Sequence, residues 1–185
     1  MINHKYFIAI IPSQPILSSI ENLKKTISDN YQIKGALRSP AHITLHMPFT
    51  WPEANEKQLI SRLELFKFHS KFMIHLKNFS CFQPRVVFID VDANEPLREL
   101  QKKLVNHVKI NLKLFNQAED LRGFHPHITI AFRDLKKPVF YKLWEEFKDK
   151  TFNETFTCQS FFLLKHINQR WEPFKEFNFY SDVNP

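Results

Sequence analysis

A four-residue pattern occurs twice in this chain. His42-Ile-Thr-Leu45 returns as His127-Ile-Thr-Ile130, 85 residues later. An apolar run precedes each copy, FIAII at 7–11 and FIDVD at 88–92. Repetition of both features within 185 residues predicts an internal duplication, with halves at about 1–84 and 85–185. A duplicated chain must fold into two similar units, so this repeat limits the architecture more than any other feature.

The two halves show strand and helix patterns in the same order. Alternating apolar residues predict the strands, and apolar residues at helical spacing predict the helices between them. The expected strands are 5–11, 42–49, 71–82, 85–91, 126–132, 154–166 and 173–180, and the expected helices follow Ser13, residue 53, Asn94 and Asp134. We therefore expect one α+β domain over residues 1–185. It should contain two β-α-β-α-β lobes with antiparallel sheets, one lobe from each half, related by pseudo-two-fold symmetry around a central groove.

Glycine is scarce in this chain, which contains only Gly35 and Gly123. The Rossmann and P-loop phosphate cradles each need several glycines at fixed spacing, so both are excluded. The two cysteines, Cys81 and Cys158, have no C-x-x-C spacing, which argues against a disulfide framework and a zinc knuckle. Any phosphate must therefore be bound by side chains or by ordinary backbone amides.

The chain is basic, with a net charge of +7. Residues 1–89 carry 11 Lys and Arg against 5 Asp and Glu, whereas residues 90–185 carry 15 against 14. A surplus in one half favours an anionic partner, although scattered lysines are also typical of a generic soluble surface. No apolar run reaches the ~18 residues of a membrane span. We expect a cytoplasmic monomer that has no membrane partner.

The repeated pattern places an imidazole and a hydroxyl on the same side of each strand. Side chains alternate faces along a strand, so His42 and Thr44 point one way, as do His127 and Thr129. Histidine has an ordinary pKa of about 6.5, so one neutral ring can accept a proton while a protonated ring donates one. Hydroxyl groups can hold the oxygens of a tetrahedral phosphate. Two such strands across one groove predict an in-line displacement at phosphorus that needs no metal.

The tandem motifs HITL at 42–45 and HITI at 127–130 resemble those of the 2H phosphoesterase superfamily, also called the 2′-5′ RNA ligase family. The segment RGFHPHITIAF at 122–132 is similar to the second motif of that family. The resemblance covers essentially the whole chain. It implies a phosphoesterase without cofactor that acts on nucleoside 2′,3′-cyclic phosphates or on phosphodiesters at RNA ends. It also implies that His42 and His127 are catalytic and that Thr44 and Thr129 bind phosphate.

The resemblance leaves several points open. We favour His127 as the base that activates water and His42 as the acid, roles that reverse in a ligation-like direction. Many relatives have an arginine in H-x-T-h-x-R, where this chain has Phe132 followed by Arg133. The weaker candidates for contacts in the groove are Arg133, His46, Arg38 and Arg122, with Phe49, Trp51, Phe124 and Trp171 as possible partners for a base.

Two other classes of protein remain as alternatives. One is an RNA-end-binding module without catalysis. The other is a metal-dependent hydrolase that uses His42, His46, His125 and His127, although no carboxylate or cysteine accompanies them at a familiar spacing.

Overall fold

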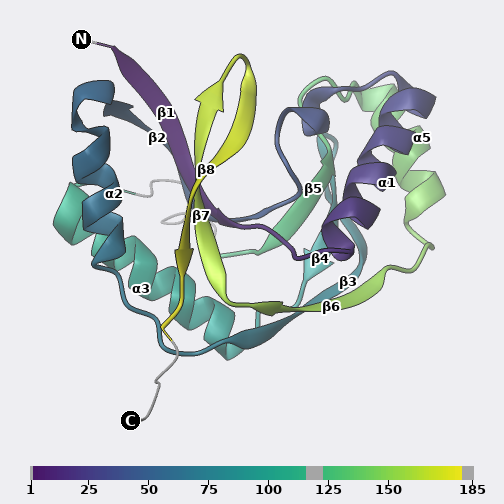
Figure 1. Ribbon diagram of the computed structural model, residues 1–185. Coiled ribbons are helices and arrows are strands. Elements are labelled where there is room, and N and C mark those ends of the chain that lie inside the picture. Colours follow the sequence, from purple (N-terminus) through teal and green to yellow (C-terminus); the bar gives the residue numbers. More distant parts are fainter. Residues whose placement is uncertain (1, 116–122, 181–185) are drawn as a thin grey trace.

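The computed structural model describes residues 2–115 and 123–180, which fold into two antiparallel four-stranded sheets (Figure 1). The first sheet has the order β2-β1-β7-β8, with β1 at Asn3–Ile10, β2 at Ile43–Pro52, β7 at Ser160–Ile167 and β8 at Arg170–Asn178. The second has the order β5-β4-β3-β6, with β3 at Phe72–Phe82, β4 at Val86–Val91, β5 at His127–Ala131 and β6 at Asn153–Cys158. In this part of the chain, the motif strands β2 and β5 are therefore edge strands.

The helices cover one side of each sheet (Figure 1). They are α1 at Ile16–Tyr31, α2 at Glu56–Glu64, α3 at Glu95–Leu112 and α5 at Lys137–Phe147, with 3₁₀ turns η1 at Gly35–Arg38 and η2 at Glu53–Asn55. Asn94 caps α3 as expected, since its side chain accepts a hydrogen bond from the Leu97 amide at 3.1 Å. None of the described helices is both long and apolar enough to cross a membrane.

The two halves of the chain exchange elements. Helix α1 follows β1 of the first sheet but packs against β5 of the second, and α3 follows β4 but packs against β2. Strands of the two halves also pair with one another, because β3 lies beside β4 and β7 lies beside β1. The expected α+β architecture with two antiparallel sheets is confirmed. The expectation that each half forms its own lobe is wrong, because exchange covers an edge and a face that each half would leave open.

The end of the chain contains three strands, whereas the sequence predicts two. Strand β6 pairs with β3 in the second sheet, and β7 pairs with β1 in the first, so the chain changes sheets at Gln159. Asn168 and Gln169 then adopt left-handed φ values of 47° and 64°, which suit a two-residue turn between β7 and β8. The apolar stretch at 154–166 therefore contributes a strand to each sheet, and its pattern alone does not show where one strand ends and the next begins.

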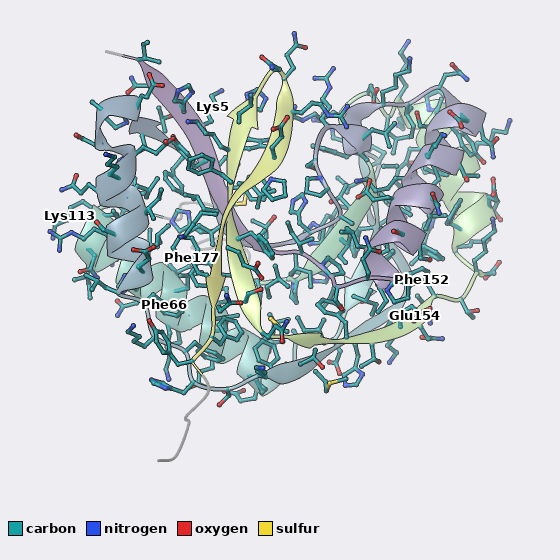
Figure 2. The ribbon with its side chains drawn as sticks, in the orientation of Figure 1. Lys5, Phe66, Lys113, Phe152, Glu154 and Phe177 are labelled. Atoms are coloured by element: carbon teal, nitrogen blue, oxygen red, sulfur yellow. The ribbon has the colours of Figure 1, made fainter. Side chains whose placement is uncertain are left out.

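Strand β1 is buried on both faces. Tyr6, Ile8 and Ile10 belong to the main core beneath the helices, whereas Phe7 and Ala9 pack with Leu164 on the opposite face. Aromatic rings also pack on the first sheet, where the Phe161 ring lies 5.7 Å from that of Phe66 and 4.9 Å from that of Phe177, between ring centres. Phe66 and Phe177 are labelled in Figure 2. Burial on both sides explains why residues 6–10 of β1 form an unbroken apolar run.

A close backbone contact joins η1 to the end of β5. The Asp134 carboxylate accepts hydrogen bonds from the Lys34 amide at 2.7 Å and from the Gly35 amide at 3.0 Å. A Cβ atom at Gly35 would lie 2.3 Å from the carbonyl oxygen of Phe132. Glycine is required here because the two segments approach too closely for any side chain.

We expect Gly35→Ala to lower the free energy of unfolding by about 1–3 kcal/mol, because η1 must move away from the end of β5. Gly123→Ala is the control. Gly123 has a φ of +70°, and a Cβ atom added there would meet nothing within 4 Å, so that variant should lose only about 1 kcal/mol of backbone strain. Urea unfolding of both variants measures the difference, and an equal or smaller loss for Gly35→Ala would contradict the packing argument.

Candidate active site

A groove of about 370 Å³ brings the two motifs together. Residues of both sheets line it, and apolar side chains form most of its wall. The lining consists of Phe7, Gly35, Ala36, Arg38, Ser39, His42, Thr44, Met47, Pro48, Phe82, Val86, His127, Thr129, Phe132, Arg133 and Trp171. The four residues of the predicted catalytic set therefore share one cavity.

Each motif histidine is held by a carbonyl two residues earlier in the chain. Nδ1 of His42 lies 2.7 Å from the Pro40 oxygen, and Nδ1 of His127 lies 2.7 Å from the His125 oxygen. A carbonyl oxygen can only accept, so Nδ1 must be the protonated nitrogen that donates. The same contact in both halves leaves Nε2 of each ring for a bound molecule.

An equivalent phenylalanine packs against each imidazole. The Phe7 ring in β1 lies 4.8 Å from that of His42, and the Phe88 ring in β4 lies 4.9 Å from that of His127, between centres. The angles between the ring planes are 52° and 51°. Phe7 and Phe88 begin the two apolar runs of the repeat, so the duplication extends to the support of both histidines.

A β-bulge follows each motif threonine. In β2, Thr44 pairs with Ala9 while His46 pairs with Ile8, which leaves Leu45 as the extra residue. In β5, Thr129 pairs with Phe88 while Ala131 pairs with Val87. A bulge adds one residue to a strand and so reverses the facing of the residues that follow. Both threonines remain in the groove, whereas His46 and Ala131, two residues after them, are buried away from it.

This geometry agrees with the comparisons with known proteins. A family model described as the 2′-5′ RNA ligase superfamily matches residues 12–170. The chain belongs to the 2′-5′ RNA ligase superfamily. The resemblance to 2H phosphoesterases inferred from the tandem motifs is therefore confirmed.

Relatives of this superfamily member match over nearly the full chain. A Bacillus cytotoxicus protein named "Putative phosphoesterase Bcer98_0945" is 26% identical over 178 residues, which cover 94% of this chain and 96% of that protein. E. coli LigT complexed with 3′-AMP has a TM-score of 0.68 at 19% identity and covers 96% of this chain and 99% of its own. TT0787 of Thermus thermophilus has a TM-score of 0.61 at 18% identity, with coverage of 96% and 99%. The structural matches show a shared fold.

His46 does not lie in the groove of this superfamily member, so the expectation based on strand alternation is wrong. The bulge at Leu45 turns the His46 ring into the core. His46 is only 1% exposed there, and its Nδ1 lies 2.8 Å from the Met47 oxygen. Within the described residues, no group of three or more His, Cys, Asp or Glu side chains could hold a metal ion. The four-histidine metal site considered from the sequence is therefore not assembled in this part of the chain.

Two of the three candidate arginines lie at the groove. Arg38, at the end of η1, and Arg133, after β5, both line it. The sequence predicts that a regular strand brings Arg133 to the groove. Instead β5 ends at Ala131, and Arg133 reaches the groove from a turn in which its φ is left-handed, at 69°. Arg122 lies outside the described residues. Both charges at the groove lie where η1 meets the end of β5.

Several groove residues are absent from the sequence-based candidates. Met47 and Phe132 follow the two bulges at equivalent positions of the repeat, and Phe82 approaches the His127 ring with 5.2 Å between centres. The motif offset of 85 residues is the signal that could have paired Met47 with Phe132. Of the four aromatic residues considered as partners for a base, only Trp171 lines the groove within the described chain.

Both histidines are held in their neutral form near pH 7. Burial lowers the pKa of His42 to about 4, and the positive charge of Lys24 adds to this effect. Burial also lowers the pKa of His127, while the nearby Asp90 carboxylate opposes that change. The two rings therefore differ electrostatically, although their geometry is nearly the same.

We expect the low pKa of His42 to make stability depend on pH. The unfolded chain binds a proton at this residue near pH 6.5, but the folded chain does so only near pH 4, so stability is full above pH 6.5 and falls as pH decreases toward 4. Urea unfolding should show a loss of about 1–2 kcal/mol between pH 7 and 5 that His42→Gln reduces. His75→Gln, at an exposed position on β3, is the control and should keep the wild-type dependence.

Proposed function

We propose that this protein is a metal-independent phosphodiesterase that opens 2′,3′-cyclic phosphates or related phosphodiesters at RNA ends. One observation carries the proposal: two imidazoles with carbonyl-bound Nδ1 atoms share one groove with two threonine hydroxyls. Superfamily relatives support it, because LigT structures exist as complexes with 3′-AMP, with ATP and with phosphate. The proposed enzyme acts as a cytoplasmic monomer without a cofactor.

In the proposed reaction, the hydroxyls of Thr44 and Thr129 donate hydrogen bonds to the non-bridging oxygens of the phosphate. One histidine takes a proton from water through Nε2 as the new P–O bond forms. The other gives a proton from Nε2 to the ribose oxygen as the old P–O bond breaks. One histidine gains a proton and the other loses one, so exchange of protons with solvent returns both rings to their starting states.

The electrostatics favour His42 as the base and His127 as the acid. A base must be neutral before the reaction, and burial keeps His42 so by lowering its pKa to about 4. An acid must hold a proton: burial lowers the pKa of His127, but the Asp90 carboxylate opposes that change and favours the protonated ring. We therefore propose the reverse of the roles preferred from the sequence alone.

The arginines that line the groove suit a longer RNA. Arg38 and Arg133 both line the cavity, and the half of the chain that carries the first motif holds most of the excess positive charge. Phosphates beyond the reacting one would approach these guanidinium groups. The proposed substrate class therefore includes RNA ends as well as mononucleotides.

Nucleoside 2′,3′-cyclic monophosphates in the presence of EDTA test the proposed activity. We expect turnover by the wild type and a loss of at least ~100-fold in kcat/KM for both His42→Ala and His127→Ala, the scale of acid–base catalysis. His75→Ala, outside the groove, should retain full activity. Binding of RNA ends without turnover on cyclic phosphates or 2′-5′-linked oligonucleotides would favour the RNA-end-binding module.

We expect a bell-shaped pH profile of kcat/KM with its maximum below pH 6.5. The base limb falls as pH decreases through about 4, where His42 becomes protonated. The acid limb falls as pH rises through the lowered pKa of His127, where that ring loses its proton. Initial rates between pH 3.5 and 8.5 measure both limbs, and a maximum above pH 7 would refute the assignment.

A further inference from the structure

A buried lysine lies behind the first catalytic histidine. Lys24 projects from α1 and is only 2% exposed. Its Nζ donates hydrogen bonds to the Ser39 carbonyl at 2.7 Å and to Oε1 of Glu21 at 2.9 Å. A buried ammonium is costly unless it is paired and hydrogen-bonded, and Lys24 is both. Such a group needs a reason beyond stability, because apolar residues often replace buried ion pairs without loss.

The same ion pair holds the segment that carries His42. Oε1 of Glu21 also accepts a hydrogen bond from the Ala41 amide at 2.5 Å. The bonds to Ser39 and Ala41 lie on either side of Pro40, whose carbonyl oxygen receives Nδ1–H of His42. Helix α1 is thereby connected to the imidazole through one short piece of backbone.

We propose that Lys24 and Glu21 are positioning residues that set the orientation, tautomer and charge of His42. Neither residue lines the groove, so they act through the 39–41 segment and through the field of the Lys24 ammonium. Because a rigid Pro40 carbonyl admits only a donor, the Nδ1–H tautomer is retained and Nε2 stays available as an acceptor. For its catalytic consequence, this inference rests on the proposed function.

The second motif is supported differently. His125 supplies the carbonyl for His127, and its own Nε2 lies 3.3 Å from Oδ1 of Asp90 on β4. The side chains of this pair are 52% and 40% exposed, so water weakens their interaction. A buried cation thus stands behind His42 and a partly exposed carboxylate behind His127. This difference in sign distinguishes two sites that the duplication otherwise makes alike.

The other charged groups near these residues must be considered in any titration. Lys24 from α1 and His127 from β5 act on His42, while Glu21 and Arg170 act on Lys24. Arg38 from η1 and Arg133 after β5 line the same groove as His42. Apart from Glu21, these groups either are cations or become cations on protonation. Removal of the Lys24 charge should therefore ease protonation of His42 without affecting His127.

NMR titration of the ¹⁵N-labelled full chain tests the inference without any assay of activity. In the wild type we expect a single Nδ1–H tautomer at His42. In Lys24→Met the His42 pKa should rise by about 0.5 or more on the pH scale, and its tautomers should begin to exchange, while His127 is unchanged. Lys25→Met, at the exposed neighbouring position of α1, is the matched control and should reproduce the wild type.

Two further variants separate the charge from the hydrogen bond. Lys24→Gln keeps a donor but removes the charge, so the pKa of His42 should rise while its tautomer is retained. Lys24→Arg keeps the charge and should hold the pKa near that of the wild type. A folded Lys24→Met or Lys24→Gln variant with an unchanged His42 pKa would overturn the inference, whichever variant of the two folds better.

Kinetics then connect the inference to the reaction. With a cyclic mononucleotide, Lys24→Met should shift the base limb of kcat/KM upward by the amount that NMR measures for His42, and it should lower kcat more than it changes KM. Absence of turnover by the wild type would refute the proposed function while leaving the NMR result intact. A kinetic loss with no shift of the base limb would show that Lys24 has only a structural role.

Discussion

The pairing of β1 with β7 and of β4 with β3 is the constraint on which the rest of the structure depends. Each pair joins strands from different halves of the chain. It leaves β2 and β5 at the edges of their sheets, where the two strands contact each other. The two His-x-Thr motifs meet in one groove because of this exchange. Hydrogen bonding within the sheets thus determines where the polar chemistry lies.

The sequence predicts the parts of the molecule that repeat. The offset between His42 and His127 correctly predicts two antiparallel sheets, and strand alternation correctly places Thr44 and Thr129 in a shared cavity. It does not predict the exchange of strands between the halves, because an apolar pattern specifies a buried face without naming the strand that pairs with it. The division of the last apolar stretch into β6 and β7 escaped prediction for the same reason.

Local backbone irregularity accounts for the remaining differences at the site. Alternation fails at His46 because one additional residue, Leu45, enters β2. It would also fail for Arg133, but a left-handed turn returns that side chain to the groove. At His46 and at Arg133, the difference from the predicted facing arises from a change of one residue in the backbone of the strand or of the turn after it. Register is determined by pairing across the sheet, and a pattern within one strand contains little information about it.

The exchanged elements also bear on how such a chain could arise. One half alone would carry one imidazole and one hydroxyl, with the edge of its first strand unpaired and its long helix without a sheet to cover. Two identical half-length chains could repair both defects by trading a strand and a helix, which is domain swapping in a symmetric dimer. Fusion of the two genes would then retain the paired motifs and free each copy to diverge. In the present chain, groups of opposite charge support the two histidines, a lysine from α1 behind His42 and an aspartate from β4 near His127.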